Sequence, residues 1–357
     1  MRKRQQTPPQ EMSTAPAVRR LSRKGGDLMS CYHPLLGVPD YNSITNRPYL
    51  TRNKKIKYRI LKTDSYNKDD LLKRDDIILI PCGKCIGCRL DYSREWANRL
   101  MLELQYHDSA YFVTLTYNKE HVPKSYYPDP ETGEAHESLT LCKRDVQLFM
   151  KRLRKAFPND KIRFYLAGEY GDEKYRPHYH AILFGLHLTD GYPWRYNREE
   201  DKNFVYYRSP ALERCWSVKD DDGVFRSIGH VEYADVCWET CAYTARYVTK
   251  KLNGQEAEFY EKFRLVPPFS HMSRKPGIGR LYYDDHPEMF EYDFLNISTE
   301  RGGLKFKPPK YYERLYELDF PDEAEQRKET RKAMAKAAIA LKLQQSTKSY
   351  GEILQTA

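Results

Sequence analysis

The sequence predicts an α+β protein built on a central, mainly antiparallel β-sheet with helices packed on one face. Two stretches, 110–117 and 178–186, are rich in β-branched and aromatic residues, as strands are. A third stretch, 143–156, spaces its apolar residues along one side of a helix. The predicted order along the chain is strand, helix, strand, strand, insertion, helix, which indicates an α+β domain.

The two ends of the chain differ in composition from its middle. Residues 1–28 combine basic residues and prolines with almost no apolar residues, so we expect a disordered basic arm. We expect order to begin near Met29. The last stretch, 286–357, is charged and becomes alanine-rich from about residue 322, which predicts a helical C-terminal extension with little sign of a core face.

A cysteine-rich segment and a main domain lie between these ends. The cysteine-rich segment covers 29–105 and closes with a helix over 93–106, where Ser93 can cap the first turn. The main domain covers 106–285 and includes a further strand candidate at 162–168.

Three more features complete the main domain. The loop at 128–133 is rich in turn residues. The stretch 187–229 is polar and aromatic, and we interpret it as an insertion with short strands. A long helix is expected over roughly 233–252.

Composition limits the classes of function. The chain has 357 residues, a formal net charge of +10 and thirty tyrosines. Basic groups beside aromatic rings favour a nucleic-acid partner, although solubility alone also explains the charge. We expect neither a membrane span nor a signal peptide, and therefore the cytoplasm. The eight cysteines should then be reduced, which favours metal binding or burial over disulfides.

Three residues form a candidate metal site. His178 and His180 lie two apart in a predicted strand, so both point to one face and Tyr179 points to the other. Glu169 ends the preceding strand, and the short turn that follows can bring it opposite the histidines. Two imidazoles and a carboxylate leave positions open for phosphate oxygens and suit Mn²⁺ or Mg²⁺, although Zn²⁺ also fits. The alternative is a pair of hydrogen-bonded sheet histidines.

A predicted helix carries two candidate nucleophiles. Tyr243, Tyr247 and Lys250 are spaced i, i+4, i+7 and share one face, away from the apolar stripe. Ordinary packing is the usual explanation for two tyrosines at this spacing. Beside a metal site, however, each phenol can attack a phosphodiester and leave a 5′-phosphotyrosine and a free 3′-OH. Lys250 would assist this transfer.

Four cysteines form a candidate structural metal site. Cys82, Cys85 and Cys88 follow one another at intervals of three, and Cys31 can supply a fourth thiolate. Four thiolates fit a closed Zn²⁺ site. An Fe–S cluster is the rival, because similar triplets bind iron, and unligated thiols are the third possibility.

Together these motifs resemble the HUH superfamily of single-strand endonucleases. More closely, the chain resembles the replication initiators of small single-stranded DNA phages, the Microviridae and especially the gokushoviruses. The match runs in order over about 29–285. It is carried by Phe112-Val-Thr-Leu-Thr-Tyr117, Arg176-Pro-His-Tyr-His-Ala181, Tyr243 with Tyr247 and Lys250, Cys31-Tyr-His-Pro34, Pro81-Cys-Gly-Lys-Cys-Ile-Gly-Cys-Arg89 and Met272-Ser-Arg-Lys-Pro-Gly-Ile-Gly279.

The resemblance implies a rolling-circle initiator acting on a phage origin in the cytoplasm of a host bacterium, with a helicase and a polymerase of the host. The candidates for DNA contacts beside the site are Arg176, Arg246 and Lys251. A transposase or relaxase of the same superfamily is the nearest alternative, although the former usually has one tyrosine and the latter a third histidine. The alternative from a different class is a non-catalytic, zinc-containing protein that binds single-stranded DNA.

Overall fold

Residue contacts in the computed structural model group Ser30–Asp319 into one compact unit. Residues 320–330 lie outside this unit, and 321–330 are helical, as expected for the start of the C-terminal extension. The predicted basic arm and the part of the extension beyond residue 330 lie outside the described residues. The structure describes residues 31–32, 35–43, 45, 47–50, 56–60, 78–171, 174–199, 202–249, 257–292, 294–299 and 302–330.

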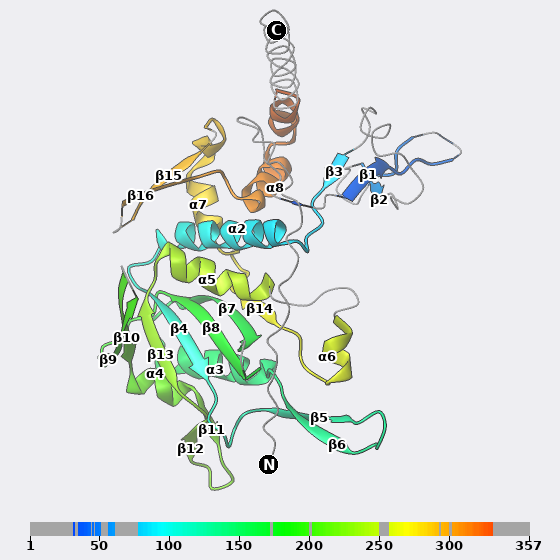
Figure 1. Ribbon diagram of the computed structural model, residues 1–357. Helices are drawn as coiled ribbons and strands as arrows, with labels where there is room; N and C mark the ends of the chain where they lie inside the picture. Colours follow the sequence, from blue (N-terminus) through cyan, green and yellow to red (C-terminus); the bar gives the residue numbers. More distant parts are fainter. Residues whose placement is uncertain are drawn as a thin grey trace, which may run out of the picture. The chain divides into compact units, whose positions relative to one another are not determined.

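A seven-stranded sheet forms the centre of the unit (Figure 1). Its strand order is β14-β7-β8-β4-β13-β10-β9, and every neighbouring pair is antiparallel, so the predicted antiparallel sheet is confirmed. The strands are β4 (Ala110–Thr116), β7 (Arg163–Tyr170), β8 (Pro177–Phe184), β9 (Tyr192–Glu199), β10 (Lys202–Arg208), β13 (Val231–Asp235) and β14 (Phe269–Met272).

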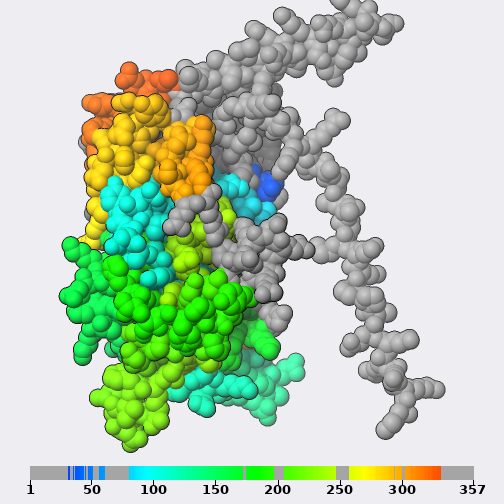
Figure 2. Space-filling model, turned by 90° about the vertical axis from the view of Figure 1, so that its left-hand side faces the viewer, coloured from blue at the N-terminus to red at the C-terminus, as the bar shows by residue number. Residues whose placement is uncertain are grey.

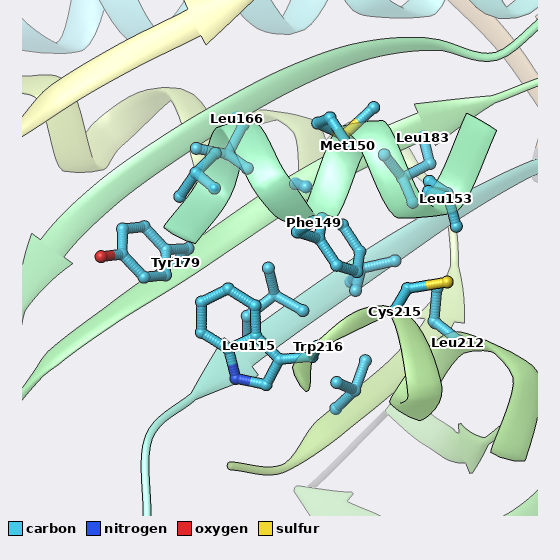
Figure 3. Packing of buried hydrophobic residues seen from close by; sticks show 14 of the residues in the cluster. Leu115, Phe149, Met150, Leu153, Leu166, Tyr179, Leu183, Leu212, Cys215 and Trp216 are labelled. Atoms are coloured by element: carbon cyan, nitrogen blue, oxygen red, sulfur yellow. The ribbon is translucent and has the colours of Figure 1, made fainter. Parts of the chain in front are cut away.

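One face of the sheet packs on α3 (Lys143–Ala156), which has the bounds predicted from the sequence. Phe149 and Leu153 of this helix meet Leu115 and Leu183 of the sheet in a buried apolar cluster (Figure 3). Burying a side chain of this size stabilises a fold by about 1.5–3 kcal/mol. This cluster therefore holds the sheet from the side opposite the histidines.

The other face packs on α2 (Ile86–Leu104) and α5 (Trp238–Thr249), so the prediction of helices on one face is wrong (Figure 1). The reason is the alternation of side chains along the strands. Phe112 and Ile182 point toward α2 and α5, whereas Val113 and Leu183 point toward α3. A sheet that is apolar on both faces needs cover on both.

The segment predicted as one helix over 233–252 is a strand followed by a helix. β13 pairs with β4, and α5 begins only at Trp238. Between them, the Cys237 N–H donates to Thr240 Oγ1 at 2.9 Å, which satisfies a donor at the start of the helix. The apolar residues of β13 are compatible with either structure, and only the pairing with β4 decides between them.

The predicted insertion, 187–229, extends the central sheet. β9 and β10 form a hairpin at its edge, and Tyr207 of β10 pairs with Tyr233 of β13. The short strands expected in this stretch are also present. The smaller elements are α4 (Pro210–Cys215), β11 (Ser217–Lys219) and β12 (Phe225–Ser227).

The cysteine-rich segment forms a small antiparallel sheet with the order β2-β1-β3, which leads into α2. The helix predicted over 93–106 begins two turns earlier than expected, at Ile86. No helix in the described part of the chain is long and apolar enough to cross a membrane. The remaining elements are β1 (Leu35–Pro39), β2 (Tyr58–Ile60), β3 (Ile78–Ile80), β5 (Lys124–Pro128), β6 (Ala135–Leu139), α6 (Glu258–Lys262), α7 (Arg280–Asp285), η3 (Pro287–Phe290), β15 (Leu295–Thr299), β16 (Gly302–Phe306) and α8 (Lys310–Asp319).

A buried carboxylate ties α2 to the sheet and to the loop before α7. Glu103 accepts hydrogen bonds from Arg163 Nε and, at 2.6 Å, from the Gly279 N–H, and it lies 3.1 Å from His107 Nε2. Burial opposes ionisation of Glu103, but these hydrogen bonds outweigh it and hold the pKa of the carboxyl below its usual range. Gly279 has φ of 73°, a left-handed conformation that favours glycine.

Candidate active site

The sheet register brings the three candidate metal ligands together. Glu169 of β7 lies directly opposite His178 of β8, and His180 follows on the same face. Glu169 Oε1 is 2.7 Å from His178 Nε2 and 3.5 Å from His180 Nε2. The three ligand atoms all lie within 4.8 Å of one another.

Tyr179, between the two histidines, points to the other face and is buried against α3. Its hydroxyl is 3.0 Å from that of Tyr117, and it accepts a hydrogen bond from the Cys142 N–H at 2.8 Å. These contacts fix β8 from behind, so the face that each histidine takes is determined on both sides of the sheet.

Both imidazoles are held through Nδ1, which directs Nε2 toward Glu169. His178 Nδ1 is 3.1 Å from the Arg176 carbonyl oxygen, which can only accept, so Nδ1 carries the hydrogen. His180 Nδ1 is 3.2 Å from Thr114 Oγ1. Histidines that bind metals are commonly oriented in this way by a partner on the second nitrogen. Two Nε2 atoms and a carboxylate therefore form a donor set that fits a divalent cation.

Burial and charge keep these groups in the protonation states that a cation needs. Burial lowers the pKa of His180, so its imidazole is neutral at pH 7. Burial alone would raise the pKa of Glu169, but hydrogen bonds from His178 and His180 outweigh that effect and hold the pKa below its usual range. Glu169 is therefore an anion at neutral pH.

Tyr243 reaches this site from α5. Its ring centroid is 5.3 Å from that of His180 and 6.0 Å from that of Phe112. Phe112 in turn stacks on His180, with centroids 5.5 Å apart and planes 7° from parallel. The Tyr243 side chain is 43% exposed, so the phenol adjoins the candidate ligands and is also accessible from solvent.

The other predicted residues of the tyrosine helix are described only in part. Tyr247 lies in α5 one turn after Tyr243, with its side chain outside the description. Lys250 and Lys251 lie outside the described residues. Arg246 is exposed on α5.

Arg176 is partly engaged in holding the loop after β4. Its Nη2 donates to the carbonyl oxygens of Tyr117 and Asn118, at 2.8 Å each. Any phosphate contact by Arg176 would come from its remaining nitrogens.

The four predicted cysteines lie together at the start of α2. Cys31 Sγ is 3.8 Å from Cys85 Sγ, and Cys82 Sγ is 4.0 Å from Cys88 Sγ. All four are free thiols whose sulfur atoms lie within 4.8 Å of one another. The cluster therefore joins the chain at residue 31 to α2.

Backbone donors surround these sulfur atoms. Hydrogen bonds from the N–H groups of Cys85 and Lys84 lower the pKa of Cys82, whereas burial raises the pKa of Cys88 to about 12. A bound cation would stabilise the thiolate form of the whole cluster, so these four residues fit a thiolate metal site.

Two residues of β4 belong to the site and were not predicted from the sequence. Phe112 stacks on His180, and Thr114 contacts its second nitrogen. Both lie in the 112–117 segment that carries the family resemblance. Their alternation gave the signal that they share a face, but only the pairing of β4 with β8 shows that it is the face of the histidines.

Fold and site define a class of protein in which a cross-strand carboxylate and two histidines adjoin an exposed tyrosine on a helix over an antiparallel sheet. The family described as Replication-associated protein of the ORF2 type matches residues 110–252, which contain all three ligands and both tyrosines. No solved structure matches the chain significantly.

Curated relatives extend the match beyond that region. The Replication-associated protein ORF2 of Spiroplasma virus 4 is 34% identical over 282 residues, 77% of this chain and 80% of that protein. The Replication-associated protein VP4 of Bdellovibrio phage phiMH2K is 27% identical over 72% of this chain and 73% of its own length. The Replication-associated protein ORF4 of Chlamydia phage 1 is 28% identical over 48% of this chain and 38% of its own length. The chain belongs to this family of phage replication-associated proteins.

Proposed function

We propose that the protein is a replication initiator that nicks single-stranded DNA at the phage origin and later rejoins the ends. The proposal rests on the contact between the rings of Tyr243 and His180, which puts an accessible phenol beside three candidate ligands. Membership of the family supports a role in replication, and the net charge of +10 supports a DNA partner.

Glu169, His178 and His180 would hold Mg²⁺ or Mn²⁺, which when bound polarises the scissile phosphate. The chain supplies the nucleophile. Tyr243 Oη attacks phosphorus, the bond from phosphorus to O3′ breaks, and the phenol proton passes to solvent while O3′ takes up a proton. The products are a 5′-phosphotyrosine and a free 3′-OH.

The covalent product retains the phosphodiester energy, so a 3′-OH can attack it and restore a continuous strand. Tyr247 would be the second nucleophile, which attacks the regenerated junction while Tyr243 still holds the first end. Lys250 would balance charge on the phosphate, and Arg176, Arg246 and Lys251 would contact the DNA backbone. A structural Zn²⁺, or with less support an Fe–S cluster, would occupy the four cysteines.

The proposed place of action is the cytoplasm of a host bacterium. There the free 3′-OH would prime synthesis by a polymerase of the host, after a helicase of the host separates the strands. No membrane partner is proposed.

The test is the formation of a covalent adduct with a labelled single strand of the cognate phage genome, in Mn²⁺, on a denaturing gel. Tyr243→Phe and Tyr247→Phe should each form some adduct but release few closed circles, and the double variant should form none. Tyr126→Phe, a change on the exposed hairpin of β5 and β6, is the control. Lys250→Ala should slow adduct formation without moving the cut.

The same gel tests the metal site. His178→Ala, or EDTA with the unchanged protein, should abolish the adduct while binding of the strand stays nearly intact. An adduct formed by the double phenylalanine variant would place the nucleophile elsewhere. Activity through one tyrosine alone would favour transposase-like chemistry, and binding without any adduct would favour a non-catalytic, zinc-containing DNA-binding protein.

A further inference from the structure

Two arginine–aromatic stacks lie on the β9–β10 hairpin, outside the site described above. The Arg208 guanidinium carbon is 3.6 Å from the ring centroid of Trp194, and that of Arg195 is 3.7 Å from the ring centroid of Tyr206. Trp194 is nevertheless 50% exposed, and Tyr192, which pairs with Arg208 across the hairpin, is 43% exposed. Large rings are therefore held in place by cations while much of their surface faces solvent.

A row of side chains connects this hairpin to the histidines across the sheet. Thr114 lies opposite His180 on one side and opposite Glu232 on the other. Glu232 accepts two hydrogen bonds from Arg195, at 2.9 Å to Nε and 2.6 Å to Nη2. β9 is four strands away from β8, which corresponds to about 19 Å at the usual strand spacing.

The charge along this row is suited to a polyanion. The Glu232 carboxylate would repel phosphate, but the bidentate contact with Arg195 compensates its charge. Arg208 adds a cation beside the exposed indole. A nucleic acid that leaves the histidines along the row would thus meet aromatic rings flanked by guanidinium groups at the edge of the sheet. Figure 1 shows β9 and β10 at that edge, and the same side of the molecule faces the viewer in Figure 2.

We propose that Trp194 and Tyr192 of this hairpin bind unpaired bases of the DNA strand that is cut at the histidine site. This inference rests on the proposed nuclease function for the identity of the strand. Exposed rings stack on bases whose faces are open, which a single strand offers and an intact duplex does not. The surface therefore selects single-stranded DNA and fixes its path away from the scissile phosphate.

The test measures binding of the full chain to a fluorescein-labelled oligothymidylate by anisotropy, in EDTA and at fixed salt, so that cleavage plays no part. Trp194→Ala should weaken binding by about 5- to 150-fold, the usual effect of losing one stacked base. Trp194→Phe, which keeps an aromatic face, should restore most of it, and Tyr192→Ala should weaken it independently. Tyr126→Ala, a comparably exposed tyrosine on another hairpin, should leave it unchanged.

Three results would overturn the proposal: unchanged binding by Trp194→Ala, no rescue by phenylalanine, or an equal loss on a duplex of the same length. The first would favour a protein partner for the hairpin. Adduct formation distinguishes this proposal from the nuclease proposal. If the unchanged protein forms no adduct but Trp194 governs binding, only the nuclease proposal fails. If Trp194→Ala forms adduct normally at limiting DNA, only the hairpin proposal fails.

Discussion

The imidazole of His180 is in contact on three sides with residues from three elements. Phe112 of β4 stacks on its face, Tyr243 of α5 meets it nearly edge-on, and Thr114 contacts Nδ1. Only Nε2 is left to point at Glu169. A ligand held in this way loses little conformational freedom when it binds a cation, so its neighbours contribute to affinity without touching the ion.

Thr114→Val should therefore weaken Mn²⁺ binding by about 10- to 100-fold, because it keeps the shape of the side chain but removes the hydroxyl that orients His180. Titration calorimetry with Mn²⁺ would measure the change. Thr116→Val is the matched control, since Thr116 Oγ1 donates to the His230 carbonyl and contacts no candidate ligand. Equal affinities in all three proteins would remove Thr114 from the site.

At the scale of elements, α2 connects the cysteine cluster with the tyrosine helix. Cys85 immediately precedes α2 and Cys88 lies in its first turn, while Ser93 Oγ donates to the Ala242 carbonyl of α5 at 2.8 Å. The packing of α2 against α5 and the sheet makes it the structural link between the two candidate metal sites.

Cys85→Ser should release the metal from the cysteine cluster and lower the midpoint of thermal unfolding, because three thiolates no longer close the site. Metal analysis and a melting curve on protein purified without chelators would test this. Cys215→Ser, at a buried thiol outside the cluster, is the control that should keep the metal. Metal-free protein before the mutation, and an unchanged melt after it, would reduce the cluster to unligated thiols.

Glu103→Gln should destabilise the protein by about 3 kcal/mol at pH 7, because it leaves the half-buried Arg163 without a counter-charge. The folded-state pKa of Glu103 is depressed, so its stabilising effect is complete above the unfolded pKa of about 4.3 and is lost as pH falls through the folded value. Urea unfolding from pH 7 to pH 3 should show the difference between the two proteins shrinking in acid. A difference independent of pH would point to packing instead.

The elements also show what a sequence can specify. α3 was predicted to the residue because its apolar residues repeat at one spacing and strong turn signals flank it. The Glu169, His178 and His180 grouping was predicted because alternation and a short turn suffice to align them. The boundary between β13 and α5, the pairing of β10 with β13 and the cover on both faces depend on contacts between distant segments, which local patterns do not record. Thr114 and Phe112 escaped notice for the same reason.

At the scale of the whole molecule, the net charge of +10 should dominate affinity for DNA of any sequence. A basic protein releases counterions from each phosphate that it contacts, so binding weakens steeply with salt. Specific chemistry at the histidines then acts on a strand that the rest of the surface has already attracted.

Arg246→Ala should reduce the dependence of log affinity on log salt by about 0.7 and weaken binding alike for unrelated single strands, as expected for one lost phosphate contact. Anisotropy titrations at several salt concentrations would give the slope. Arg226→Ala is the control, because that guanidinium pairs with Asp220 on the hairpin of β11 and β12. The same slope in Arg246→Ala and the unchanged protein would exclude Arg246 from the interface.

The two sides of β8 also limit how the gene can change in length. His178 and His180 face α5, while Tyr179 faces α3. One codon gained or lost just before His178 would slip the strand by a residue and exchange these faces, burying two imidazoles in an apolar core and leaving every ligand still encoded. Hairpin ends such as the 128–133 loop can absorb such changes. Across β8, selection should therefore act on the spacing of residues as strictly as on their identity.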